Sequence, residues 1–150
     1  MFMEMKKKLD IIDMDGNDCK GEVIIGHEKY DRTVTLNLES EDNSYILELA
    51  LRMGCKSYIR LFKSSKSETD VYMQKVRATE INKIVWGIRM VKHGQLDSFT
   101  LSIDDGEKQP ITYKFHLLND KLTVSIGKKD MFTIVNDMVF VTVLRGYKDI

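Results

Sequence analysis

The side chains best suited to chemistry are aromatic and cationic residues at alternate positions of one segment. Tyr58, Arg60 and Phe62 are two residues apart, so in an extended strand they point to the same face. Aromatic rings stack on unpaired bases and cations contact phosphates, which is one way for a sheet face to hold single-stranded nucleic acid. An ordinary solvated sheet surface is the alternative explanation. The candidate nucleic-acid-binding residues are Tyr58, Arg60, Phe62, Lys63, Lys114, His116 and Lys121.

Residues 13–18 read Asp-Met-Asp-Gly-Asn-Asp, which invites comparison with a calcium-binding loop. An EF-hand loop needs glycine at its sixth position and a bidentate glutamate at its twelfth. Those two positions hold Asp18 and Ile24 here. The spacing therefore predicts an acidic turn and no metal site.

The sequence also lacks catalytic and cofactor signatures. His27, His93 and His116 are scattered, and Cys19 and Cys55 form no Cys-x-x-Cys pair, so neither zinc-site spacing nor an activated thiol is indicated. No glycine-rich phosphate loop and no Gly-x-Ser-x-Gly motif occurs. We expect a non-enzymatic binding protein without cofactor or metal.

Composition limits the class of protein. The 150 residues include 23 Lys or Arg and 23 Asp or Glu, so the net charge is zero. That balance counts against coating nucleic acid without sequence preference, although a local patch can still be basic. No apolar run of signal-peptide or membrane-spanning length is present. With two cysteines and no export signal, we expect reduced thiols and a cytoplasmic location without membrane attachment.

Hydrophobic periodicity predicts mostly strands. Apolar residues alternate with polar ones in several segments, and Asn119-Asp120 is placed as a two-residue hairpin turn. The segments predicted as strands are 33–38, 45–52, 58–62, 98–103, 111–117 and 122–126, with less certain strands at 8–13 and 21–26. Residues 81–91 instead carry an amphipathic stripe, which predicts a helix with Thr79 as N-cap and Gly94 just beyond its end.

The two halves of the chain resemble each other. Strand positions match at an offset of 54 residues, and after one loop the five apolar helix positions match at an offset of 50. The repeat predicts a helix over 129–145, although β-branched residues there favour a strand on propensity alone. We therefore expect an α+β fold in one domain, 1–150, with a duplicated antiparallel strand-strand-strand-helix unit (about 31–94 and 95–146) and extra N-terminal strands. The alternative is an all-β sandwich or barrel.

Strands followed by a helix are predicted twice in the chain. This arrangement resembles the PC4-like and Whirly group of single-stranded nucleic-acid-binding folds. The resemblance is topological, covers 44–146, and rests on the strand-to-helix passages 71–94 and 121–146. It implies single-stranded DNA or RNA as ligand and is compatible with a homo-oligomer. The alternative function is a protein-interaction or assembly accessory protein, viral or bacterial, which the zero net charge fits better.

Overall fold

The computed structural model describes residues 2–128 and 130–147, which form ten strands and two helices. The strands are β1 (Phe2–Ile12), β2 (Asp18–Glu28), β3 (Asp31–Glu39), β4 (Asn43–Leu51), β5 (Ser57–Ser65), β6 (Thr69–Val76), β7 (Ser98–Ile103), β8 (Ile111–Leu118), β9 (Lys121–Ile126) and β10 (Asp130–Ile134). The helices are α1 (Ala78–Lys92), between β6 and β7, and α2 (Asp137–Gly146), after β10.

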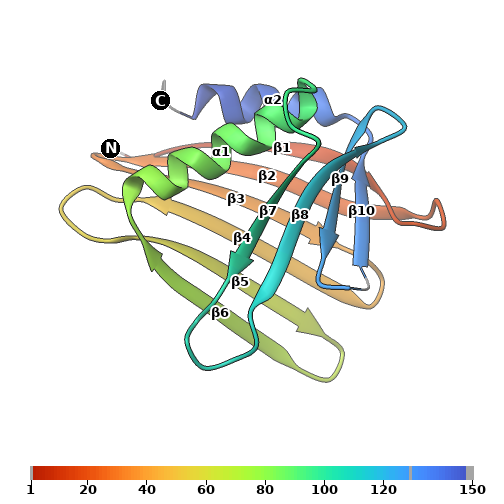
Figure 1. Ribbon diagram of the computed structural model, residues 1–150, viewed down its shortest axis with the longest axis horizontal. Helices are drawn as coiled ribbons and strands as arrows, with labels where there is room; N and C mark the ends of the chain where they lie inside the picture. The colour runs from red at the N-terminus through yellow and green to blue at the C-terminus, as the bar shows by residue number, and fades with distance from the viewer. Residues whose placement is uncertain (1, 129, 148–150) are drawn as a thin grey trace.

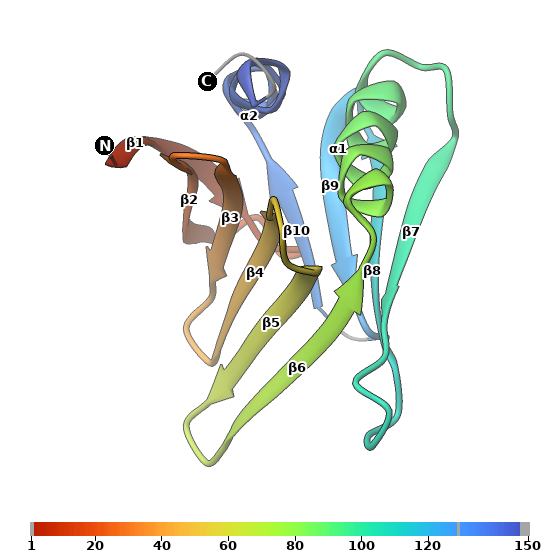
Figure 2. The ribbon, with the colours of Figure 1, turned by 90° about the vertical axis from the view of Figure 1, so that its left-hand side faces the viewer.

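All ten strands belong to one antiparallel sheet, in the order β6-β5-β4-β3-β2-β1-β10-β9-β8-β7. Strand β1 joins the two halves, because it pairs with β2 along its length and with β10 at Ile11 and Ile12. The sheet curls until its two edge strands approach each other, so it is a nearly closed barrel (Figures 1 and 2). Side chains connect these edges: Gln74 accepts a hydrogen bond from the Asp104 N–H at 3.1 Å, and Lys108 donates to the Val71 carbonyl at 2.5 Å.

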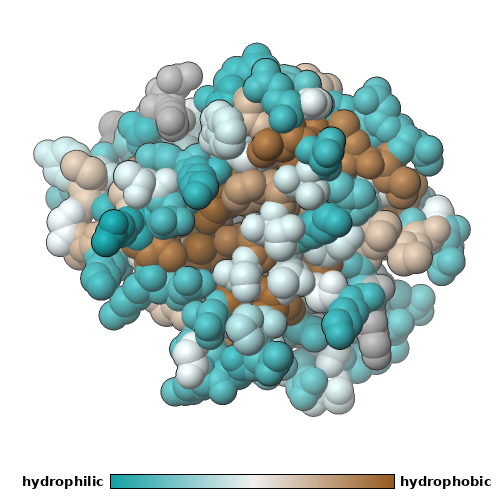
Figure 3. Space-filling view, in the orientation of Figure 1, coloured by the Kyte–Doolittle hydropathy of each residue, from teal (hydrophilic) through white to brown (hydrophobic). Residues whose placement is uncertain are grey.

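The core lies inside this curled sheet. Alternate residues of each strand point inward, as Val34, Leu36 and Leu38 of β3 show with at most 3% exposure. Both helices pack at one end of the enclosed space (Figure 2), and α1 turns its buried Ile81-to-Val91 stripe toward the strands. The face that carries α1 shows apolar residues in its middle and hydrophilic residues around them (Figure 3).

A buried ion pair connects the two helices. Lys92 Nζ, at the end of α1, lies 2.7 Å from Asp137 Oδ2, at the start of α2, and the two side chains are 12% and 1% exposed. The same carboxylate oxygen accepts the backbone N–H of Leu122 at 2.9 Å, and Lys92 also donates to the carbonyl of Asp120 at 2.8 Å. These contacts fix both helix ends to the β8–β9 hairpin.

The predicted α+β fold with duplicated strand-strand-strand-helix units is wrong, and the all-β barrel given as its alternative fits the structure. The helix predicted over 129–145 is confirmed only from Asp137 onward, where α2 lies, because residues before it form the strand β10. Met131 and Ile134, which the repeat matched to helix positions, lie in β10. There Phe132 and Ile134 are both buried, as alternation in a strand requires. Residue 129 lies outside the described residues, and α2 begins only at Asp137.

The first helix is confirmed with one shifted boundary. Arg77, and not Thr79, occupies the N-cap position of α1, and its side chain makes no capping hydrogen bond. Gly94 follows the C-cap His93 with φ of 78°, the left-handed conformation that glycine adopts most easily. Within the described residues, neither helix has the length and apolar composition that crossing a bilayer requires.

Candidate anion-binding site

Strand β5 presents three of the predicted residues on the outer surface of the barrel. Tyr58, Arg60 and Phe62 are half-buried and alternate with the buried Ile59 and Leu61. The sequence pattern therefore assigned them correctly to one face. Because the opposite face fills the core, this outer face is the one open to a ligand.

Arg60 is already engaged in contacts within the protein. Its guanidinium donates to Glu48 of the neighbouring β4 at 2.6 Å, and its Cζ lies 5.2 Å from the ring centroid of Tyr58 and 5.1 Å from that of Phe62. Burial and the Glu48 carboxylate raise the pKa of Tyr58, so its hydroxyl stays neutral near pH 7. Arg60 therefore orders the two aromatic rings, and its charge is largely balanced by Glu48.

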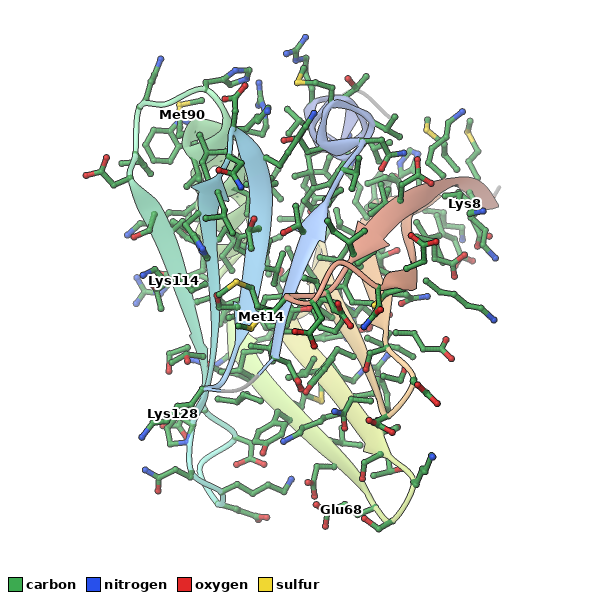
Figure 4. All side chains as sticks on the ribbon, turned by 90° about the vertical axis from the view of Figure 1, so that its right-hand side faces the viewer. Lys8, Met14, Glu68, Met90, Lys114 and Lys128 are labelled. Atoms are coloured by element: carbon green, nitrogen blue, oxygen red, sulfur yellow. The ribbon has the colours of Figure 1, made fainter. Side chains whose placement is uncertain are left out.

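The other predicted residues do not join these three on one face. Lys114 and His116 lie on β8, next to the β7 edge of the sheet, and Lys121 begins β9. Lys114 lies on the outer side of the β7–β8 arm (Figure 4), where the curl of the sheet turns it away from β5. Lys63, at the far end of β5, is paired in register with Asp70 of β6. The single flat face expected from the sequence is therefore divided by curvature.

His116 contributes little positive charge at neutral pH. Burial lowers the pKa of its imidazole, and the nearby Lys114 ammonium lowers it further. Near pH 7 the ring is therefore mostly neutral, which disfavours a role for His116 in holding phosphate.

A different feature gathers cations without balancing acids. A concave pocket of about 640 Å³ lies between the β4–β5 loop and the junction of β6 with α1, both at the left in Figure 1. We name this pocket the basic cup. Its lining residues are Arg52, Gly54, Cys55, Lys56, Ser57, Lys75, Val76, Arg77 and Ala78. The cup thus contains four cations and no carboxylate among its lining residues.

The cup is built by two adjacent connections. Register pairing of Ser57 with Val76 brings the end of the β4–β5 loop beside the end of β6. Gly54 turns that loop with φ of 79°, and the Ser57 hydroxyl, buried at 2% exposure, accepts the Arg52 N–H at 3.1 Å. The first turn of α1 then begins at the cup, so its unpaired backbone N–H groups add to the positive potential.

The four cations have no ion-pair partner within the described part of the chain. The ion pairs found there involve Lys6, Arg60, Lys66, Lys92 and Lys108, none of which lines the cup. Lys56, Lys75 and Arg77 are exposed, while Arg52 is half-buried. Like charges in a pocket whose lining contains no carboxylate repel one another, so an anion that binds there relieves the repulsion.

The opposite end of the barrel has the complementary charge. A pocket of about 340 Å³ there is lined by Asp13, Asp15, Glu41, Asp42 and Asp130, together with polar and apolar residues. Burial, and then Asp42, raises the pKa of Asp130, which also accepts a hydrogen bond from the Tyr45 hydroxyl. Asp13 Oδ1 accepts the N–H groups of Asp15 and Asn17, each at 2.9 Å, which is the turn predicted from the sequence. Although the net charge of the chain is zero, one end of the barrel is basic and the opposite end is acidic.

The basic cup continues onto the outer face of β5. Tyr58 is paired in register with Lys75, and it shares a smaller neighbouring groove with Arg52. That groove also contains Glu28 and Asp31, so the cationic surface ends there. Aromatic rings and the basic cup consequently lie side by side along β5.

The four cations of the basic cup are not among the candidate nucleic-acid-binding residues predicted from the sequence. One signal was available: two cations directly precede a predicted helix. Basic residues at a helix N-terminus oppose the helix dipole, so Lys75 and Arg77 are unfavourable for the helix itself. Such a placement suggests a role other than stabilising the helix.

The described His, Cys, Asp and Glu side chains form no group of three that could hold a metal ion. Cys19 is a half-buried free thiol, and Cys55 is an exposed one in the basic cup. Comparison with protein-family models, curated proteins and solved structures gives no match to this chain.

Proposed function

We propose that this protein binds single-stranded nucleic acid in the cytoplasm, through the basic cup and the adjoining outer face of β5. The observation that supports the proposal is the gathering of four cations, with no carboxylate in the lining, beside two ordered aromatic rings. Phosphates supply the negative charge that such a cluster lacks, and every base offers a ring face for stacking.

Each part of the surface has a separate task. Arg52, Lys56, Lys75 and Arg77 contact the backbone phosphates, whereas Tyr58 provides a ring next to the basic cup. Arg60 holds that ring in place and contributes little net charge, because Glu48 balances it. The local cluster thus explains how a chain of zero net charge can bind a polyanion.

Salt dependence provides the quantitative test. Four phosphate contacts predict a slope of log K against log salt of about −3 for a single strand, or a roughly 50-fold loss of affinity between about 50 and 200 mM salt. Fluorescence anisotropy with a labelled oligonucleotide of about 16 nucleotides measures both quantities. No binding at roughly 100 µM protein and low salt would refute the proposal.

Matched alanine variants locate the contacts. Lys75→Ala and Arg77→Ala should each weaken binding and reduce the salt slope by about 0.7, because each removes one phosphate contact. Lys114→Ala is the control, since it removes an equally exposed cation from the other arm of the sheet. If Lys114→Ala weakens binding as much as Lys75→Ala does, the basic cup is not the site.

A protein-binding surface is the second candidate, and the outer face of β6 favours it. Val71 and Met73 are 40% and 41% exposed there, on an edge strand of the sheet, and Val71 is paired in register with Phe62. An exposed apolar strip on the outer face of a sheet can pack against an apolar surface of a partner protein. Val71→Lys separates the two functions: it should weaken a nuclease-resistant protein complex, and it should leave oligonucleotide affinity equal or higher.

A further inference from the structure

The density of charge in the basic cup exceeds what one internal phosphodiester needs. Two short connections place Arg52, Lys56, Lys75 and Arg77 around a single pocket. An internal phosphodiester carries one negative charge, whereas a phosphate monoester carries about 1.5 to 2 near pH 7 and offers three acceptor oxygens. The basic cup is therefore better matched to a monoester.

The position of the cup also suits the end of a strand. The aromatic residues of β5 lie on one side of it, at Tyr58, while α1 begins on the other side, at Ala78. The side chain of the N-cap residue Arg77 makes no capping bond, so the first N–H groups of α1 remain open to an acceptor. Because Tyr58 is paired in register with Lys75, which lines the pocket, a base stacked on Tyr58 would have its phosphate close to the basic cup.

We propose that the basic cup selects the terminal phosphate of a single strand, a phosphate monoester, over the phosphodiesters within the strand. This inference rests on the proposed function and adds a preference for one kind of strand end. The terminal phosphate binds at Lys75 and Arg77, beside the first turn of α1, and Arg52 and Lys56 contact the adjoining phosphates of the strand, while the adjacent base stacks against Tyr58. A strand with a terminal hydroxyl keeps the stacking but loses one charge-assisted set of hydrogen bonds.

Binding of three oligonucleotides of identical sequence tests the preference. One carries a 5′-phosphate, one a 3′-phosphate and one hydroxyl groups at both ends, with an internal fluorophore for anisotropy. We expect one phosphorylated strand to bind about tenfold more tightly than the hydroxyl strand, the effect of one added hydrogen bond to a charged group. Lys75→Ala and Arg77→Ala should abolish this ratio, and Lys114→Ala should preserve it.

Cys55 provides a readout at the site itself, because its exposed thiol lines the basic cup. In a Cys19→Ala background, the rate of maleimide labelling reports on Cys55 alone. The phosphorylated strand should slow labelling at concentrations at which the hydroxyl strand does not. If pyrophosphate slows labelling and neither phosphorylated strand does, the basic cup is a site for small anions and the inference is wrong.

The outcomes separate the two proposals. If no strand binds, the proposed function fails and the inference fails with it. If all three strands bind equally, the proposed function stands and the terminal-phosphate inference is overturned. A preference that survives both Lys75→Ala and Arg77→Ala also overturns it, because the selecting residues then lie elsewhere.

Discussion

The buried ion pair between the two helices allows a quantitative prediction about stability. Lys92→Met keeps the apolar stem of the side chain but leaves the Asp137 carboxylate, at 1% exposure, without its cation. At the N···O separation of 2.7 Å, two unit charges attract by about 6 kcal/mol at an effective dielectric constant of 20. Only part of this is net, because both groups lost hydration on folding. The backbone N–H of Leu122 remains as a partner for the carboxylate.

We expect Lys92→Met to lower the free energy of unfolding by about 3–5 kcal/mol, the usual cost of removing one partner of a buried pair. With an m-value of about 2 kcal/mol per molar, the urea midpoint should fall by roughly 2 M. Urea unfolding followed by circular dichroism measures this. Adding Asp137→Asn to Lys92→Met should recover part of the loss, because no unpaired charge then stays buried.

Lys83→Met is the matched control, since Lys83 is an exposed lysine of the same helix. Its effect should stay within about 0.5 kcal/mol. The reasoning fails if Lys92→Met costs less than about 1 kcal/mol. It fails equally if the losses from Lys92→Met and Asp137→Asn simply add in the double variant.

Three further predictions concern other parts of the barrel. Gly87→Ala should lower the free energy of unfolding in urea by about 1–3 kcal/mol, although alanine has the better helix propensity. The reason is that a Cβ at this position would lie 2.3 Å from Cδ2 and 2.8 Å from Cγ of Phe99. Adding Phe99→Leu should restore part of the loss. An NMR titration should give His116 a pKa below 6.5, and Lys114→Ala should raise the pKa of His116. Because the pKa is lower in the folded state than in the unfolded state, the contribution of His116 to stability is lost as the pH falls from 6.5 through the folded-state pKa. Asp105 accepts N–H and ammonium hydrogen bonds within its own turn, which lower its pKa to about 2. Its contribution to stability is therefore present above pH 3.8 and lost as the pH falls toward 2. Asp105→Asn should flatten the profile of stability against pH in that range.

Local features of the fold could be predicted from the sequence. Alternation predicted most of the strands, and the apolar stripe from Ile81 to Val91 predicted α1. The turn at Asn119 and Asp120 forms as predicted, with φ of 50° and 64°. These features depend on neighbours within a few residues, and so the sequence contains the necessary information.

The structure of residues 130–146 depends on residues that are far away in the sequence. Its apolar residues fit both a helical and an alternating pattern, and the apparent repeat favoured a helix throughout, whereas the structure has a strand at Asp130–Ile134 and a helix only from Asp137. In the structure, Ile134 of β10 pairs with Ile11 of β1, more than a hundred residues earlier in the chain. That pairing joins the two halves of the sheet, and it cannot be predicted from the pattern of neighbouring residues.

The candidate site, too, could be predicted from the sequence only in part. That Tyr58, Arg60 and Phe62 share a face could be predicted, because side-chain direction in a strand has a period of two. That Lys114 lies on another arm of the sheet could not, since curvature is a property of all ten strands together. The basic cup likewise exists because the β5–β6 pairing brings two loops together. Sequence sets which way each side chain points, and long-range strand pairing sets which charges meet.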